Sequence, residues 1–164
     1  MSTYHIYTDG SHFKNGGSGR LGIGGVLIDP SKNLPRGEKL NSFSMEINRD
    51  YLSVHYGTED CSNPTMEMMA VLVALKEFKG SFKLGDKIKL MADYEGVKYW
   101  LEGKWQAKKS YIRKLKEEIL SEIKSQNLDI EFIWVKGHQK KTGEVSNEAY
   151  WNSEVDKLAK GDNK

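Results

Sequence analysis

Cysteine is nearly absent from this chain of 164 residues, and proline occurs only three times. The single cysteine, Cys61, excludes an internal disulfide framework. A lone thiol of this kind is typical of proteins that work in a reducing compartment, where it is usually an inert residue. We therefore expect a cytoplasmic protein and assign Cys61 no chemical role.

Long hydrophobic runs and an excess of one charge are also missing. No apolar stretch approaches the roughly 18 to 20 residues that span a bilayer, and residues 1–6 do not begin a signal-peptide pattern. We therefore expect no membrane partner. The 25 basic and 23 acidic residues leave a formal net charge of +2, so total charge gives no argument for a nucleic-acid partner.

The composition is that of one folded domain. Its 38% apolar and 29% charged residues are typical of a soluble globular chain rather than a disordered one. A chain of 164 residues is long enough to bury a sizeable core and short enough for one domain. We therefore assign residues 1–164 to a single domain.

Hydrophobic periodicity predicts five strands and four helices. The strands are expected at 4–9, 22–29, 40–47, 87–93 and 128–135, and the helices at 63–79, 94–101, 110–125 and 147–160. Residues 48–62 show no clear period, so we predict a long loop there. Three hairpin-joined strands followed by strands that alternate with helices predict an α/β fold. Its five-stranded mixed sheet should be antiparallel first and parallel later, with helices on both faces.

The segment Tyr-Thr-Asp-Gly-Ser at 7–11 ends the first predicted strand and opens onto a glycine-rich turn. It places the carboxylate of Asp9 at the strand end, where Gly10 leaves the backbone open to a phosphate. Taken alone, an aspartate before a glycine is commonly just a turn residue. Asp9 becomes a candidate site residue because three later acids lie on elements that can return to it.

Those acids are Glu67, Asp93 and Asp156. If the first and fourth strands are parallel neighbours, Asp9 and Asp93 leave the same edge of the sheet. Glu67 lies in the first turn of a predicted helix, where it could instead simply complement the positive helix end. Clustered carboxylates repel one another and raise each other's pKa values unless a cation lies among them. Oxygen ligands favour Mg²⁺ or Mn²⁺ over zinc, and two such ions suit phosphodiester hydrolysis.

Two further side chains are candidates for the same site. His138, in a late polar loop, could move a proton near neutral pH, or be an ordinary loop histidine. Asn152 shares a helix face with Asp156, so it could orient a water or support the metal site. The alternative for Asn152 is an exposed helix residue.

Taken together, the motifs resemble ribonuclease H type 1. They are the segment at 7–11, Asn-Pro-Thr-Met-Glu-Met-Met-Ala at 63–70, Asp93 at a strand end, Trp-Val-Lys-Gly-His at 134–138, and Asn-x-x-x-Asp-x-Leu-Ala at 152–159. The likeness covers nearly the whole chain, in the family's order. Two stretches, 48–62 and 139–150, are longer than the family pattern.

The resemblance implies an endonuclease that cuts the RNA strand of an RNA–DNA hybrid and leaves 5′-phosphate and 3′-hydroxyl ends. It implies two Mg²⁺ ions, with Mn²⁺ possible, held by Asp9, Glu67, Asp93 and Asp156, with His138 as the mobile-loop histidine. It also implies substrate contacts at Gly10, Ser11, Ser62 and Asn63, with Ser62 at a DNA-strand phosphate. A monomer is the family-based expectation.

A basic, tryptophan-containing stretch at 98–116 looks like a shortened form of the family's hybrid-gripping protrusion. Trp105, Lys108 and Lys109 are its candidate hybrid contacts, whereas Lys114 and Lys116 are also explained by a solvated helix face. Two other functions remain open. One is a catalytically silent hybrid- or duplex-binding module of the same fold. The other is a proofreading exonuclease, which typically has Asp-x-Glu in its first strand, where this chain has Asp9-Gly10-Ser11.

Overall fold

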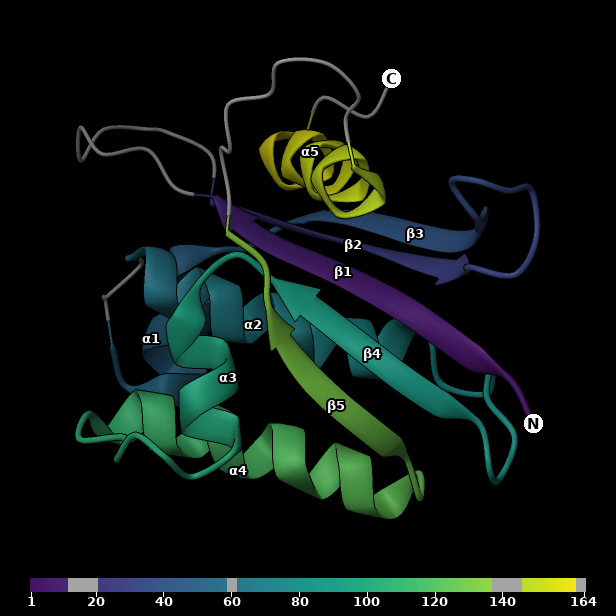
Figure 1. Ribbon diagram of the computed structural model, residues 1–164. Coiled ribbons are helices and arrows are strands. Elements are labelled where there is room, and N and C mark those ends of the chain that lie inside the picture. Colours follow the sequence, from purple (N-terminus) through teal and green to yellow (C-terminus); the bar gives the residue numbers. More distant parts are fainter. Residues whose placement is uncertain (12–20, 59–61, 137–145, 162–164) are drawn as a thin grey trace.

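The computed structural model describes residues 1–11, 21–58, 62–136 and 146–161 (Figure 1). One five-stranded sheet runs through it in the order β3-β2-β1-β4-β5. The strands are β1 (Thr3–Ser11), β2 (Gly22–Asp29), β3 (Glu38–Glu46), β4 (Lys87–Ala92) and β5 (Asp129–Trp134). The first three pair antiparallel, whereas β4 is parallel to both β1 and β5. The mixed sheet predicted from the sequence is therefore confirmed.

Helices cover both faces of the sheet, as expected (Figure 1). They are α1 (Arg49–Tyr56), α2 (Asn63–Glu77), α3 (Glu95–Leu101), α4 (Ser110–Ser125) and α5 (Asn147–Lys160). α5 lies over β1, β2 and β3 on one face, and the other four helices lie on the opposite face. No described helix is long and apolar enough to cross a membrane.

The sheet separates two hydrophobic cores, and the side chains of β1 alternate between them because successive residues of a strand point to opposite faces. Ile6, fully buried, packs with residues of α2 and α4 in the larger core. Tyr7, its neighbour, points to the other face and packs with Trp151 and Val155 of α5. Helix α2 is buried along most of its length, which explains its continuous apolar sequence.

The prediction of a loop at 48–62 is wrong, because α1 occupies most of that stretch. The side chain of Asn48 caps the helix by accepting a hydrogen bond from the Asp50 N–H (2.7 Å). Gly57, in the left-handed region at φ +65°, ends it. The helix was missed because only Leu52 and Tyr56 are buried, which is too few residues to show a helical period.

The cap of α2 lies one residue before the position that the sequence favours. Asn63 followed by Pro64 predicts Asn63 as the N-cap, but Ser62 is the N-cap residue and Asn63 is the first helical residue. No acid lies in the first turn of α2, and Glu67 is fully buried. Glu67 therefore does not serve as a surface charge against the helix end. Its burial calls for a different explanation, which the neighbouring strand ends provide.

Candidate active site

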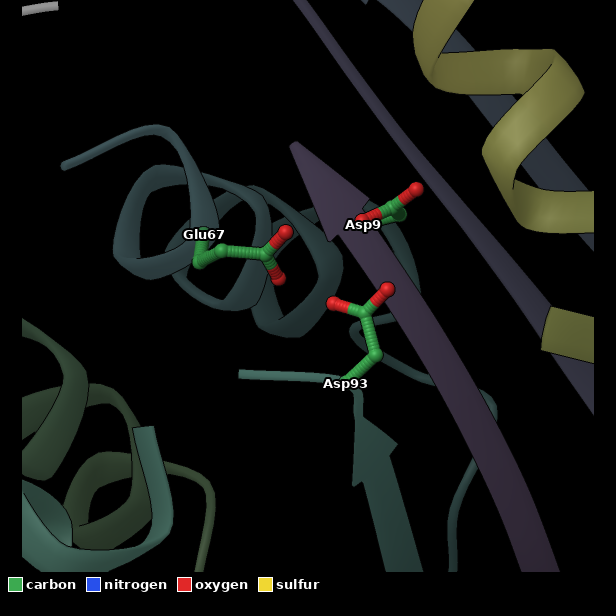
Figure 2. Close-up of side chains that lie close together, drawn as sticks. All are labelled: Asp9, Glu67 and Asp93. Carbon is green, nitrogen blue, oxygen red and sulfur yellow. The ribbon is translucent and has the colours of Figure 1, made fainter. Parts of the chain in front are cut away.

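Parallel strands β1 and β4 bring Asp9 and Asp93 to the same edge of the sheet. Thr8 of β1 lies opposite Ala92, the last residue of β4, so an aspartate comes next on both sides: Asp9 within β1 and Asp93 directly after β4. Asp9 is only 4% exposed, and Asp93 is half-buried. Figure 2 shows Glu67 extending from α2 toward the two strand ends.

A close approach between β1 and α2 positions Glu67. The Gly10 N–H donates a hydrogen bond to Glu67 Oε2 over 3.1 Å. A Cβ on Gly10 would lie 2.5 Å from the carbonyl carbon of Met66, which is closer than any real packing contact. Glycine is therefore required at this position, because α2 could not otherwise come near enough for Glu67 to reach the strand end.

Ligand atoms of Asp9, Glu67 and Asp93 all lie within 4.8 Å of one another. The pKa of Asp9 is raised to about 8, first by burial and then by the nearby carboxyl groups of Asp93 and Asp156, against an opposing hydrogen bond from Glu67. Burial and the charge of Asp9 also raise the pKa of Glu67 well above its ordinary value. Ionised together and unaided, these groups would destabilise the fold.

The donor set of this cluster suits a hard divalent cation. All three side chains offer carboxylate oxygens, the ligands that Mg²⁺ and Mn²⁺ prefer. Glu67 Oε1 is buried without a hydrogen-bond partner among the described residues. Such an orphaned oxygen is costly in a buried site unless a cation or water meets it. The residues present therefore fit a metal centre.

Asp156 lies beside this cluster but outside the group of three. Its carboxylate raises the pKa of Asp9 through a hydrogen bond and through charge, so the two groups are close. Asp156 is 32% exposed and forms a salt bridge with Lys160 Nζ at 3.0 Å. Asn152, one turn earlier on α5, is half-buried. His138 lies outside the described residues.

A separate cavity of about 260 Å³ holds several predicted substrate contacts, and we call it the Lys109 cavity. Its lining joins the start of α2 to the α3–α4 connection: Ser62, Pro64, Thr65, Tyr94, Trp100, Gln106, Lys108, Lys109 and Ile112. Ser62 therefore lies near Lys108 and Lys109, although it is far from them in the sequence. Thr65 is 1% exposed, and its Oγ1 has no hydrogen-bond partner in the described part of the chain.

Trp105 is not part of that cavity. It is 38% exposed and stacks against Tyr99, with ring centroids 5.1 Å apart, and it lines a neighbouring hollow with Lys104. Sequence reasoning missed Thr65, Tyr94 and Trp100 as lining residues of the Lys109 cavity. In the sequence, only their closeness to the predicted contact residues could have indicated this role. A threonine in an apolar helix and two aromatic residues are otherwise typical of a hydrophobic core.

The chain matches known proteins along most of its length. The family model RNase H matches residues 1–163. Ribonuclease H of Treponema denticola is 30% identical over 165 residues, covering 88% of this chain and 89% of that protein. Ribonuclease H of Hahella chejuensis is 30% identical over 147 residues, covering 84% and 83%.

Solved structures share the fold. RNase H1 of the archaeon Halobacterium salinarum superposes with a TM-score of 0.70 at 20% identity, covering 98% of this chain and 97% of that one. LC11-RNase H1, solved in complex with an RNA/DNA hybrid, has a TM-score of 0.70 at 19% identity, covering 94% and 92%. The sheet, its helices and the acid cluster define a nuclease-type fold with a candidate metal site. The chain belongs to the RNase H family and is a ribonuclease H by class.

Proposed function

We propose that this protein is an endonuclease that hydrolyses the RNA strand of RNA–DNA hybrids with two divalent ions, Mg²⁺ or Mn²⁺. The observation that carries the proposal is the buried group of Asp9, Glu67 and Asp93, whose ligand atoms lie within 4.8 Å of one another. When bound, two such ions activate the attacking water and stabilise the leaving oxygen. The expected products have 5′-phosphate and 3′-hydroxyl ends.

The chain's own residues would hold and orient this chemistry. Asp9, Glu67 and Asp93 supply carboxylate oxygens, and the amide of Gly10 fixes one oxygen of Glu67. Asp156 is the fourth ligand in this proposal, supported by its closeness to Asp9. Asn152 would support Asp156 from the same helix face.

His138 would assist proton transfer or product release. Replacing it with alanine should slow turnover without abolishing it, because the carboxylates would still hold the metal ions. An unchanged rate from pH 6 to 9 would remove this role.

Substrate contact would use the strand end and the Lys109 cavity. Gly10 and Ser11 would lie at the RNA backbone, and Asn63 near the scissile nucleotides. The 2′-hydroxyl is the chemical feature that distinguishes RNA from DNA at such a site. A DNA-strand phosphate would meet Ser62, Lys108 and Lys109. They line one cavity with the Thr65 hydroxyl, which has no hydrogen-bond partner among the described residues.

The test is cleavage of a hybrid whose RNA strand carries an end label. Internal cuts with Mg²⁺, none with EDTA, and none in single-stranded or duplex RNA are expected. Glu67→Gln should reduce cutting to background, whereas the matched control Asp129→Asn, an exposed acid on β5, should cut normally. Tight hybrid binding without cleavage under Mg²⁺ or Mn²⁺ would instead support a silent binding module, and exonucleolytic ladders would contradict endonuclease action.

A further inference from the structure

A cavity of about 340 Å³ opens on the α5 side of the sheet, and we call it the His5 cavity. Its lining includes His5 and Tyr7 of β1, Lys89 and Met91 of β4, Ile133 of β5 and Trp151 of α5. None of these residues belongs to the carboxylate cluster or to the Lys109 cavity. The volume falls at the lower end of the range of small-molecule pockets, roughly 300 to 1,000 Å³.

Hydrogen bonds fix one wall of the His5 cavity. The turn after β2 is tied to the start of α5 by Asn147 Nδ2, which donates to the Pro35 carbonyl (2.6 Å). Trp151 Nε1 donates to the carbonyl of Arg36 (2.8 Å), and the Arg36 guanidinium donates to the carbonyl of Ser146 (3.1 Å). The wall is therefore formed before any ligand arrives, which lowers the entropic cost of binding.

Tyr7 adds a hydroxyl group to the lining of the His5 cavity. Its side chain is 2% exposed, yet it lines the cavity and lies among the apolar residues of the α5 core. No hydrogen bond to its hydroxyl is formed within the described ranges. The hydroxyl is not among the enclosed polar atoms that lack a partner, so it faces the open space of the cavity. A ligand atom in the cavity can therefore reach it.

The charged groups favour an anion. Lys89 lies directly opposite His5 in the parallel β1–β4 register, and both line the cavity. Burial and the charge of Lys89 lower the pKa of His5 against the opposing charge of Glu148, so this imidazole is neutral at pH 7. The charged lining residues are then Arg36, Lys89 and Glu148, with a net charge of +1. Met91, Ile133 and Trp151 form the apolar remainder.

We propose that the His5 cavity binds a compact organic anion with a carboxylate or phosphate headgroup on an apolar body. The headgroup meets Lys89 and His5, the body packs against Met91, Ile133 and Trp151, and the Tyr7 hydroxyl bonds to the ligand. The proposal does not depend on hydrolysis of nucleic acid, and it can fail or succeed independently of the proposed function.

The test is titration of the full chain, without nucleic acid or divalent metal, followed by two-dimensional NMR of its backbone amides. Phenyl phosphate and benzoate are the two organic probes, and inorganic phosphate and phenol are the half-ligands. Saturable shifts centred on β1 and β4 are expected with at least one organic probe, and which one binds more tightly identifies the headgroup. Equal affinity for inorganic phosphate or for phenol would overturn the proposal, as would no saturation by either organic probe.

Variants locate the site. Lys89→Gln should weaken binding about tenfold, because the charge-assisted contact is lost, and Tyr7→Phe should weaken it several-fold. Lys87→Gln is the matched control, since Lys87 is exposed on the same strand but does not line the cavity. Tyr7→Phe should not lower stability in urea, because the hydroxyl has no hydrogen-bond partner to lose among the described residues. Unchanged affinity in both Lys89→Gln and Tyr7→Phe would place the probe elsewhere and refute the assignment.

Discussion

At the scale of single residues, Asp9 combines burial with three acidic neighbours, Glu67, Asp93 and Asp156. Its carboxylate is 4% exposed, and its pKa is raised to about 8 by burial first and by nearby carboxyl groups second. Asp9→Asn removes a carboxyl group that the metal-free fold must either protonate or keep ionised, both at a cost in stability. We expect the variant to be more stable in EDTA by on the order of 1–3 kcal/mol, and to lose hydrolysis entirely. Urea unfolding and the hybrid assay measure the two effects.

Asp129→Asn serves as the control for Asp9→Asn, since that acid is exposed and outside the cluster. It should change neither stability nor cleavage noticeably. A fully active Asp9→Asn protein would refute the assignment of Asp9 as a metal ligand.

Gly10→Ala should have the opposite effect on stability. The added Cβ would meet Met66 backbone atoms at 2.5 and 2.7 Å, so β1 and α2 must separate and the bond from the Gly10 amide to Glu67 is strained. We expect a loss of roughly 1–3 kcal/mol, typical of overpacking, together with greatly reduced cleavage. Urea unfolding and hybrid cleavage again measure both. Unaltered stability and activity would show that the close approach has no functional role.

Part of this residue-level arrangement could be predicted from the sequence. Asp9 and Asp93 each follow a strand-like run, and the rule for parallel strands places such residues at one edge. The contact of Gly10 with Glu67 could not be predicted, because it joins positions 57 residues apart through the packing of a helix on a strand. For the same reason the sequence indicates Glu67 as a candidate ligand in the first turn of a helix but does not predict that its carboxylate is fully buried.

At the scale of elements, α4 and α5 were predictable and α1 was not. The apolar positions of α4, Ile112, Leu115 and Ile119, repeat at helical spacing and are buried. Helix α1 has only two buried residues among eight, so its sequence shows no clear helical period. Its capping residues indicate the helix better than its apolar residues do. Asn48 and Gly57 were the available signals, at the two ends of an otherwise unpatterned stretch.

The α3–α4 connection carries the element-scale prediction. Lys108 and Lys109 line the Lys109 cavity, and Lys104 lies in the adjacent hollow. Replacing all three with glutamine should weaken hybrid binding and make it less salt-dependent, because fewer counterions are released from phosphates. Binding titrations between about 50 and 200 mM salt measure the slope.

Lys124 is an exposed lysine in the last turn of α4. The variant Lys124→Gln tests whether the loss of any surface lysine lowers the salt dependence of binding. It should leave the salt slope nearly unchanged. If the slope of the triple variant equals that of the unmodified protein, the three lysines are only surface charge.

At the scale of the whole molecule, the buried acids should make stability depend on pH. Asp9 has a folded-state pKa of about 8, far above its ordinary value, so between those values the folded state binds more protons than the unfolded state. The free energy of unfolding in EDTA should therefore fall as pH rises toward 8. The lowered pKa of His5 acts in the opposite direction only below its ordinary value of 6.5, so pH 7 to 8.5 is the informative window.

Urea unfolding across that window provides the measurement. Asp9→Asn should flatten the dependence, and saturating Mg²⁺ should reduce it, because the metal favours the ionised carboxylates. Stability that rises from pH 7 to 8.5 in EDTA would contradict the account.

The central claim is that Asp9, Glu67 and Asp93 form a divalent-metal site, and calorimetric titration with Mg²⁺ tests it most directly. Titrations at pH 7 in two buffers of different ionisation enthalpy give the number of protons released per ion bound. Because the cluster holds a proton at this pH when metal-free, binding should release a proton, and Asp9→Asn should abolish both binding and release. Mg²⁺ binding that is unaffected by Asp9→Asn, or no binding by the unmodified protein with or without a hybrid, would contradict the claim.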